Sequence, residues 1–387
     1  MASFRPILPL FYRFIFIGVF FLVFFPVFIL ADGLDREIKE LETFSKSFSL
    51  VKDVFLFEKT DRELILSAIK GMVEGLDAYG GILSRGELEK LENNTLGERK
   101  GVGVNLDKEN GFFVISRVIK GSPAEKAGLA QGLIVTRIND YEISKLGDEE
   151  MLKLIEDSTS DELRLEYHHP LTPRESKKIR LEKSQFKENS VETLNPLPGV
   201  LVFRIHQFIK DTPQEIRTQL KLHEHKGVIL DLRNNPGGLL ISAVELAEMF
   251  VPKGVIVMIR DNKDEIVDKY ISRRSKEDLI PVVLVLINRE TASAAEILAG
   301  AIKDLKAGVL IGERSFGKGV VQSIYPVSDD LYIKLTTAKY YTASGISFHQ
   351  KGIQPDIPVK DSALFTRYKK DDLIYNKALE MIAGLLK

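Results

Sequence analysis

The spacing of apolar residues predicts two amphipathic helices near the N-terminus. Residues 34–48 and residues 60–76 repeat apolar side chains every three or four positions, which is the period of one helix face. The tripeptide Tyr79-Gly80-Gly81 ends the second repeat, because glycines at this place favour a turn. We therefore expect an N-terminal helical region over residues 32–99.

From Gly101 the apolar pattern changes from the period of a helix to the period of a strand. Val102, Val104 and Leu106 alternate with small or polar residues, as in a half-buried strand. Further strand-like runs follow, and short helical segments separate them. The sequence predicts that these elements form a second, compact module over residues 100–185.

Beyond residue 185 the apolar runs are continuous, and segments with helical periodicity separate them. Strands without a polar face are buried on both sides, which is typical of a parallel sheet covered by helices. The sequence therefore predicts a layered α/β domain over residues 186–362, followed by a C-terminal helix within residues 363–387. The predicted buried strands are residues 200–205, 227–233 and 281–288.

Two loops of the predicted α/β domain follow buried strands, at the sheet edge where reacting groups collect. They are residues 234–238 and residues 289–293. Ser293 ends the second loop and forms a capping box with Glu296, so on this evidence alone a helix cap explains it better than a nucleophile. The same position also suits catalysis, because free N–H groups at a helix N-terminus face incoming negative charge.

The residues around Ser293 supply the donors that a nucleophilic serine needs. The N–H of Ala294 would face the oxyanion of a tetrahedral intermediate, with the N–H of Gly237 or Gly238 on the opposite side. Alanines at 292, 294 and 295 leave room for a peptide to approach.

A further motif, residues 312–318, matches the G-x-x-x-x-G-K pattern of a phosphate-binding loop. The next residue is Gly319 instead of a magnesium-binding serine or threonine, and the following residues favour a strand where a phosphate loop opens a helix. We therefore reject nucleotide binding.

Lys318 remains as a lysine in a loop of small residues. Burial between apolar segments would lower the pKa of Lys318 and let its neutral amine accept a proton from a serine, whereas a solvated surface lysine is the alternative. Gln322 lies four residues on, on the same strand face, where a hydrogen bond from its side chain would hold the amine.

Composition excludes several classes of function. The formal net charge is −1 and basic residues are spread along the chain, which argues against nucleic acid as a partner. Cysteine is absent, so disulfides and thiolate metal sites are excluded. Histidines occur in two groups, His168-His169 and His223-Glu224-His225. Neither group has a partner at metal-ligand spacing, so we expect no metal site.

The N-terminus has the composition of an export signal. Arg5 and Arg13 lie before or beside an apolar run that extends from Phe14 to Ala31. The run is also close to the roughly 17–25 residues of a membrane-spanning helix, so a retained anchor is the alternative to a signal cleaved after Ala31. Either interpretation exports the body of the chain. We expect the periplasm or cell envelope, with membrane contact only through residues 1–31.

Three motifs of the second module occur together. They are GVGV at 101–104, GSPAEKAGL at 121–129 and IVTRIND at 134–140. In this order they resemble a PDZ domain. The resemblance implies that a peptide adds a strand to the sheet edge and that main-chain N–H groups of a glycine-rich loop bind its terminal carboxylate. The implied peptide-binding residues are Gly101, Val102, Gly103 and Val104.

Four more motifs follow in the α/β domain. They are DLRNNPGGLL at 231–240, TASAAEI at 291–297, GERSFGKGVVQ at 312–322 and TAKYYTASGISFHQKGIQPDI at 337–357. In order and spacing they resemble the carboxyl-terminal processing proteases, which are serine peptidases with a Ser–Lys dyad. The resemblance implies that Ser293 is the nucleophile, Lys318 the general base and Gln322 its orienting partner. It also implies an oxyanion hole from residues 235–238 and Ala294, and a mechanism without a metal or other cofactor.

The predicted fold is multidomain, α/β and α+β, with a PDZ domain and a layered protease core of crotonase-like or ClpP-like type behind a helical N-terminal segment. The predicted function is that of an exported endopeptidase that cleaves proteins near their C-termini. Its partners would be proteins or peptides with free C-termini, and the terminal helices are compatible with a homo-oligomer. Two alternatives remain: a catalytically silent PDZ scaffold of the cell envelope, and a crotonase-like acyl-transfer or lipid-binding protein.

Overall fold

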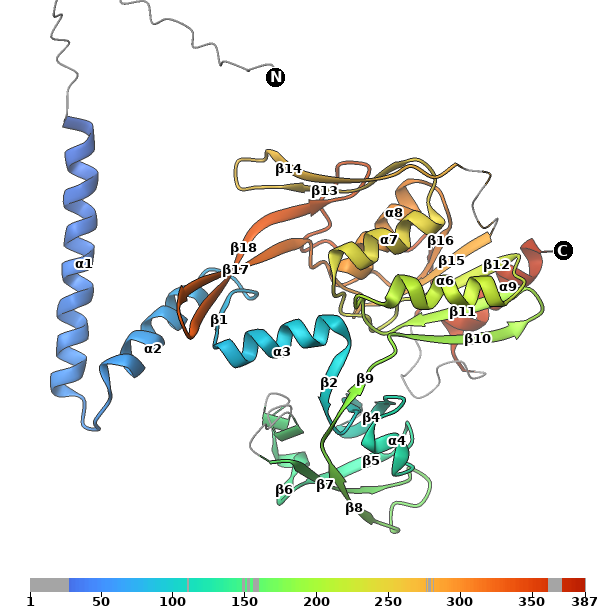
Figure 1. Cartoon of the computed structure of the whole chain (residues 1–387), viewed down its shortest axis with the longest axis horizontal. Helices are drawn as coiled ribbons and strands as arrows, with labels where there is room; N and C mark the ends of the chain where they lie inside the picture. The colour runs from blue at the N-terminus through green and yellow to red at the C-terminus, as the bar shows by residue number, and fades with distance from the viewer. Residues whose placement is uncertain are drawn as a thin grey trace, which may run out of the picture. The chain divides into compact units, whose positions relative to one another are not determined.

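The computed structural model, shown in Figure 1, describes residues 28–386 except for 110, 148–149, 152–153, 156–159, 276, 278–279, 281 and 361–370. The chain divides into two compact units, residues 1–69 and residues 70–387. The predicted signal or anchor, residues 1–31, lies almost entirely outside the described residues. Within the part that is described, no helix has both the length and the apolar character that crossing a membrane requires.

The first unit contains helix α1, Phe28–Val54, and most of helix α2, Asp61–Glu74. A capping box opens α2, as the N–H of Glu63 donates to the hydroxyl of Thr60 at 3.2 Å and the N–H of Thr60 donates to the Glu63 carboxylate at 2.9 Å. Both helices lie where the apolar spacing predicts them.

In the second unit, residues 104–182 form an antiparallel module. Its elements are β3 Val104–Glu109, β4 Phe112–Val118, α4 Pro123–Lys126, β5 Ile134–Ile138, β6 Tyr141–Glu142, η1 Ile143–Lys145, β7 Glu162–His168 and β8 Lys177–Glu182. The strand order is β3-β4-β5-β7-β8, and β6 pairs with β5. Inward-facing side chains such as Phe113, Ile115 and Leu163 are buried together in one core. The strands that the change of periodicity after Gly101 indicates lie in this module, and the predicted bounds of residues 100–185 stay a prediction.

The α/β domain is built on a largely parallel sheet. Its strands are β10 Val191–Leu197, β11 Val200–Ile205, β12 Gly227–Asp231, β15 Val282–Ile287, β16 Val309–Gly312 and β19 Ile357–Pro358. They lie in this order in the sheet, and only β10 is antiparallel to its neighbour. The predicted buried strands correspond to β11, β12 and β15.

Helices cover both faces of this sheet. They are α6 Thr212–Leu222, α7 Leu240–Phe250, α8 Ala294–Asp304 and α9 Leu373–Leu385. Alternate strand residues, such as Leu230 and Val285, pack in one core with α7 and α8, whereas Ile229 and Leu284 pack against α9. The strands have no polar face because both faces are covered, which explains their continuous apolar runs.

A second sheet carries the strand that follows the Lys318 loop. Its strands are β1 Gly81–Leu83, β13 Gly254–Arg260, β14 Ile266–Ser272, β17 Val320–Ser328 and β18 Leu331–Tyr341. The order is β1-β18-β13-β14, and β17 forms a hairpin with β18. Helix α3, Arg85–Leu96, follows β1, and the short pair β2 Glu98–Gly101 and β9 Ser184–Lys187 connects the antiparallel module at both of its ends. Long-range pairing of β1 with β18 was not visible in the local patterns.

Candidate active site

Ser293 lies in a strained turn between strand β15 and helix α8. It is the N-cap residue of α8, and its backbone has φ +55° and ψ −118°. A positive φ is uncommon for a residue with a Cβ atom and persists only where the surroundings enforce it, which happens most often at functional sites. Within residues 291–302, Ser293 alone is not buried. The turn therefore presents this one side chain to the surface of a packed region.

Glu296 joins the Ser293 turn to the Lys318 loop. Its carboxylate is fully buried, and its Oε2 accepts the main-chain N–H of Ser293 and that of Lys318, both at 2.8 Å. Its Oε1 accepts the N–H of Gly317 at 2.7 Å and the hydroxyl of Ser315. The sequence indicates Glu296 only as half of a capping box. The structure adds three donors from a loop that lies further along the chain.

Lys318 is half buried in the loop between β16 and β17. Burial lowers the pKa of its amine, the positive charge of Lys334 lowers it further, and the carboxylate of Asp77 acts in the opposite direction. Its Nζ lies over the aromatic ring of Tyr79, 5.2 Å from the ring centroid. The pKa of Lys318 is thus shifted in the direction that a general base requires.

Gln322 contacts the same tyrosine. Its side-chain amide donates a hydrogen bond to the main-chain oxygen of Tyr79. The structure therefore brings Gln322 and Lys318 together through a third residue, which the sequence patterns indicate only as the end of a helix. The predicted direct bond between Gln322 and the amine stays a prediction.

The glycine loop of residues 235–238 packs directly against the Ser293 turn. A Cβ atom on Gly237 would lie 2.7 Å from the Cβ of Ser293 and 2.9 Å from the nitrogen of Ala294, so only glycine fits there. The N–H of Ala292 donates to the main-chain oxygen of Asn235 at 2.9 Å and ties the two loops together. The predicted oxyanion residues thus lie beside the predicted nucleophile.

The two glycines differ in what their N–H groups do. The N–H of Gly237 donates to Oδ1 of Asn235 at 2.8 Å. Within the described part of the chain, the N–H of Gly238 has no hydrogen-bond acceptor. Ala294 is the first residue of α8, so its N–H has no acceptor inside the helix. The N–H groups of Gly238 and Ala294 are therefore available to an acceptor from outside, and their role in an oxyanion hole stays a prediction.

The predicted peptide-binding residues 101–104 form the passage from β2 into β3, beside helix α4. The main-chain oxygens of Val102 and Gly103 accept N–H groups of Ala124 and Ile119, each at 2.9 Å. Gly103 has φ +82°, and a Cβ atom there would lie 2.1 Å from the Cβ of Ser122. The loop is thus closely packed against α4, and its role in binding stays a prediction.

Comparison with protein families gives two matches. Residues 199–359 match the model of peptidase family S41, and residues 92–168 match the model of the PDZ domain. A protein of Staphylococcus epidermidis described as a probable CtpA-like serine protease is 32% identical over 337 residues, which are 85% of this chain and 67% of that protein. A similarly described protein of Staphylococcus aureus is 32% identical over 334 residues, 85% of this chain and 66% of its own length. The chain spans about two thirds of the length of these relatives.

A solved structure agrees with these matches. The photosystem II D1 C-terminal processing protease is similar over 81% of this chain and 86% of its own, with a TM-score of 0.53 and 29% identity. Together the comparisons confirm the predicted combination of a PDZ domain with an α/β protease core. The chain belongs to peptidase family S41, a family of serine proteases, and carries a PDZ domain.

Proposed function

We propose that this chain is an exported serine endopeptidase that cleaves proteins near their C-termini, with Ser293 as nucleophile and Lys318 as general base. One observation carries the proposal: the main-chain N–H groups of both residues donate to the same oxygen of Glu296. It supports the proposal because one acceptor ties the main chain of a strained, partly exposed serine to that of a half-buried lysine.

The proposed reaction begins with a neutral Lys318. Its amine accepts the hydroxyl proton of Ser293 while Oγ forms a bond to the carbonyl carbon of the scissile peptide. The N–H groups of Gly238 and Ala294 would stabilise the negative charge on the former carbonyl oxygen. The C–N bond then breaks, the ammonium of Lys318 returns its proton to the leaving amine, and an ester on Ser293 remains.

Water completes the proposed cycle. It attacks the ester carbon while Lys318 again accepts a proton, and Ser293 leaves with that proton as the second product acquires a new terminal carboxyl group. Each proton that Lys318 accepts is returned within the same half of the reaction. The lowered pKa of Lys318 supports this role, because a fully solvated lysine would be almost entirely charged at neutral pH.

The substrate class rests on the comparisons and on the second domain. The similar solved structure is described as a C-terminal processing protease, and we extend this activity to the present chain. The PDZ domain would bind the terminal carboxylate of the substrate through the N–H groups of residues 101–104. We further propose that residues 1–31 export the enzyme to the periplasm or cell envelope, as a cleaved signal or as an anchor.

Cleavage of an unfolded protein by the purified full chain tests the mechanism. Ser293→Ala and Lys318→Ala should each abolish cleavage without changing the urea midpoint of unfolding by much. A fluorophosphonate probe should label the unmodified chain on Ser293 and leave Ser293→Ala unlabelled. Full cleavage by either variant would contradict the mechanism. Binding of the unfolded protein without any cleavage would instead support a silent PDZ scaffold.

A further inference from the structure

A short turn outside the S41-matching segment lies directly against the proposed base. The turn, residues 77–80, connects α2 to β1, whereas the S41 match begins at residue 199. Tyr79 contacts two of the proposed site residues at once. Its ring lies under the Nζ of Lys318, and its main-chain oxygen accepts the side-chain amide of Gln322.

Asp77 holds the turn in its conformation. Its Oδ1 accepts the main-chain N–H of Tyr79 at 2.7 Å and that of Gly80 at 2.8 Å. The hydroxyl of Thr336 and these two N–H groups lower the pKa of the Asp77 carboxyl against the effect of burial. The carboxylate is therefore negatively charged at neutral pH, and its charge acts on Lys318.

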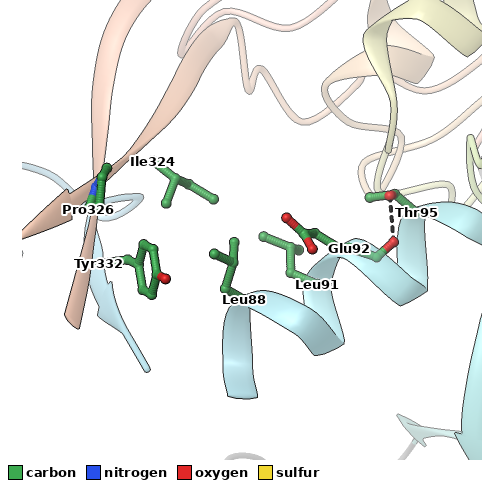
Figure 2. Close-up of a pocket in the computed structure, with 7 residues that line it drawn as sticks. All are labelled: Leu88, Leu91, Glu92, Thr95, Ile324, Pro326 and Tyr332. Atoms are coloured by element: carbon green, nitrogen blue, oxygen red, sulfur yellow. Dashed lines mark hydrogen bonds between the residues drawn. The ribbon is translucent and has the colours of Figure 1, made fainter. Parts of the chain in front are cut away.

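The chain after the turn is attached to the hairpin that carries Gln322. Strand β1 pairs with β18, with Gly81 opposite Lys334. The guanidinium of Arg85, at the start of α3, donates to the main-chain oxygen of Asp329 at 2.6 Å. Helix α3 and the hairpin also form an apolar groove of about 330 Å³. Figure 2 shows residues that line it, among them Leu88, Leu91, Ile324 and Tyr332. The β1–β18 pairing and the Arg85 bond hold the chain that follows the turn against the hairpin that carries Gln322.

The groups around Lys318 act on its two protonation states in opposite directions. Burial and the positive charge of Lys334 favour the neutral amine, which is the form that accepts a proton. The carboxylate of Asp77 and the face of the Tyr79 ring favour the ammonium, which is the form present after the proton has moved. Interactions that are stronger in the transition state than before it accelerate the reaction.

We propose that Tyr79 and Asp77 are positioning residues of the catalytic base: Tyr79 holds Lys318 and Gln322, and Asp77 fixes Tyr79 and stabilises the ammonium of Lys318. This inference rests on the proposed function of Lys318. Asp77 and Tyr79 then do for a lysine what a third residue does for the base of a catalytic triad, which is to orient it and to stabilise its protonated form.

The variant Asp77→Asn separates the charge from the turn, because the amide oxygen can still accept the N–H groups of Tyr79 and Gly80. Without the charge, the pKa of Lys318 falls. We expect the acid limb of kcat/KM against pH to move to lower pH and kcat on the plateau to fall about tenfold.

His349 also faces this cluster, with its ring 6.0 Å from that of Tyr79. Burial lowers the pKa of His349, which separates its titration from that of Lys318.

Substitutions of Tyr79 test the contact with the ring. Tyr79→Leu keeps the main-chain oxygen and removes the ring, so the acid limb should again move to lower pH. Tyr79→Phe keeps both the ring and the main-chain oxygen and should retain most of the activity. As matched controls, Asp329→Asn on the β17–β18 turn and Tyr325→Leu on the exposed part of β17 should show the unmodified pH profile.

The outcomes separate this inference from the proposed function. Full activity in Lys318→Ala would overturn both. An inactive Lys318→Ala together with unmodified profiles in Asp77→Asn and Tyr79→Leu would overturn only the role of the turn. A loss of activity in Asp77→Asn without movement of the acid limb would show that the turn acts on folding alone and would also overturn the inference.

Discussion

The main-chain N–H groups of Ser293 and Lys318 point at the same atom, Oε2 of Glu296, at 2.8 Å each. The side chains of Ser293 and Lys318 take no part in these two hydrogen bonds. The relationship depends on a buried carboxylate whose pKa burial raises above the ordinary value, with the hydrogen bonds that it accepts acting in the opposite direction. The Glu296 side chain therefore holds the proposed nucleophile loop and the proposed base loop together, beside a main-chain bond from the N–H of Phe316 to the oxygen of Thr291, which makes Glu296 a sensitive position.

Replacing Glu296 by glutamine should disturb both loops. Glu296→Gln substitutes an NH₂ donor for one acceptor oxygen, so main-chain N–H groups on that side lose their acceptor. We expect the free energy of unfolding to fall by about 1–3 kcal/mol, the usual cost of leaving a buried polar group unsatisfied. We also expect cleavage of an unfolded protein to slow by at least about tenfold. Urea unfolding and initial cleavage rates measure the two effects.

Glu248→Gln is the matched control for this substitution. Glu248 is exposed on helix α7, so the same chemical change there should leave both the stability and the cleavage rate unaltered. If Glu296→Gln cleaved at the rate of the unmodified chain, the shared carboxylate would not be needed to align the site.

Gly237 is a position where only glycine fits beside the proposed nucleophile. A Cβ atom there would approach the Cβ of Ser293 to 2.7 Å and the oxygen of Ala292 to 2.9 Å, at a φ of +103°. Gly237→Ala should therefore push the two loops apart and misplace the donors of the proposed oxyanion hole. We expect kcat to fall by about 10²–10³, the usual effect of losing one oxyanion donor. Steady-state kinetics measures this change.

A second glycine substitution shows whether the effect is local. A Cβ atom on Gly384, in helix α9, meets no heavy atom within 4 Å. Gly384→Ala should keep the activity and raise the free energy of unfolding by up to about 1 kcal/mol, as in other helices. Normal kcat in Gly237→Ala would show that the glycine loop does not take part in the reaction.

The sequence patterns predict those features of the fold that depend on residues close together in the sequence. Continuous apolar strands such as Val282–Ile287 indicate a sheet covered on both faces, and the structure has that sheet. Ser293 and Lys318 each lie inside a short motif, but the motif of Ser293 alone favours a helix cap and that of Lys318 leaves a surface lysine as the alternative. Their proposed roles come from the resemblance of several motifs together to the carboxyl-terminal processing proteases.

Local sequence patterns do not predict the contacts of Tyr79. Its main-chain oxygen accepts a hydrogen bond from Gln322, which lies 243 residues further along the chain. Every residue type has a main-chain oxygen, so the identity of residue 79 does not reveal this bond. Glu296 was visible only through its local bond to Ser293, because its bonds to Gly317 and Lys318 depend on how two strands are arranged in space. Local periodicity contains no information about either arrangement.

A buried ion cluster anchors helix α9 to the strand before the glycine loop. The guanidinium of Arg233 donates to both oxygens of Asp231, at 2.9 and 2.8 Å, and to both oxygens of Asp372, at 2.7 and 3.0 Å. Asp372 also caps α9 through the N–H of Tyr375. Asp372→Ala should lower the free energy of unfolding by about 3–5 kcal/mol, because it leaves a buried charge less well compensated. Urea unfolding measures this loss.

The exposed neighbour Asp371 provides the control for the cluster. Asp371→Ala removes a carboxylate at the same end of α9 and should change the free energy of unfolding by less than about 0.5 kcal/mol. Equal effects of the two substitutions would show that the cluster contributes no more than a surface charge does.

Lys334 should govern the pH at which the enzyme becomes active. After burial, its positive charge is the second cause that keeps the pKa of Lys318 below the ordinary 10.5. Lys334→Gln removes that charge, so the pKa of Lys318 rises and less neutral amine is present at neutral pH. The acid limb of kcat/KM should move to higher pH, opposite to its movement in Asp77→Asn, while the alkaline plateau is kept. Lys253→Gln, an exposed lysine elsewhere, should leave the profile unchanged. An unmoved limb in Lys334→Gln would mean that the measured ionisation belongs to a group other than Lys318.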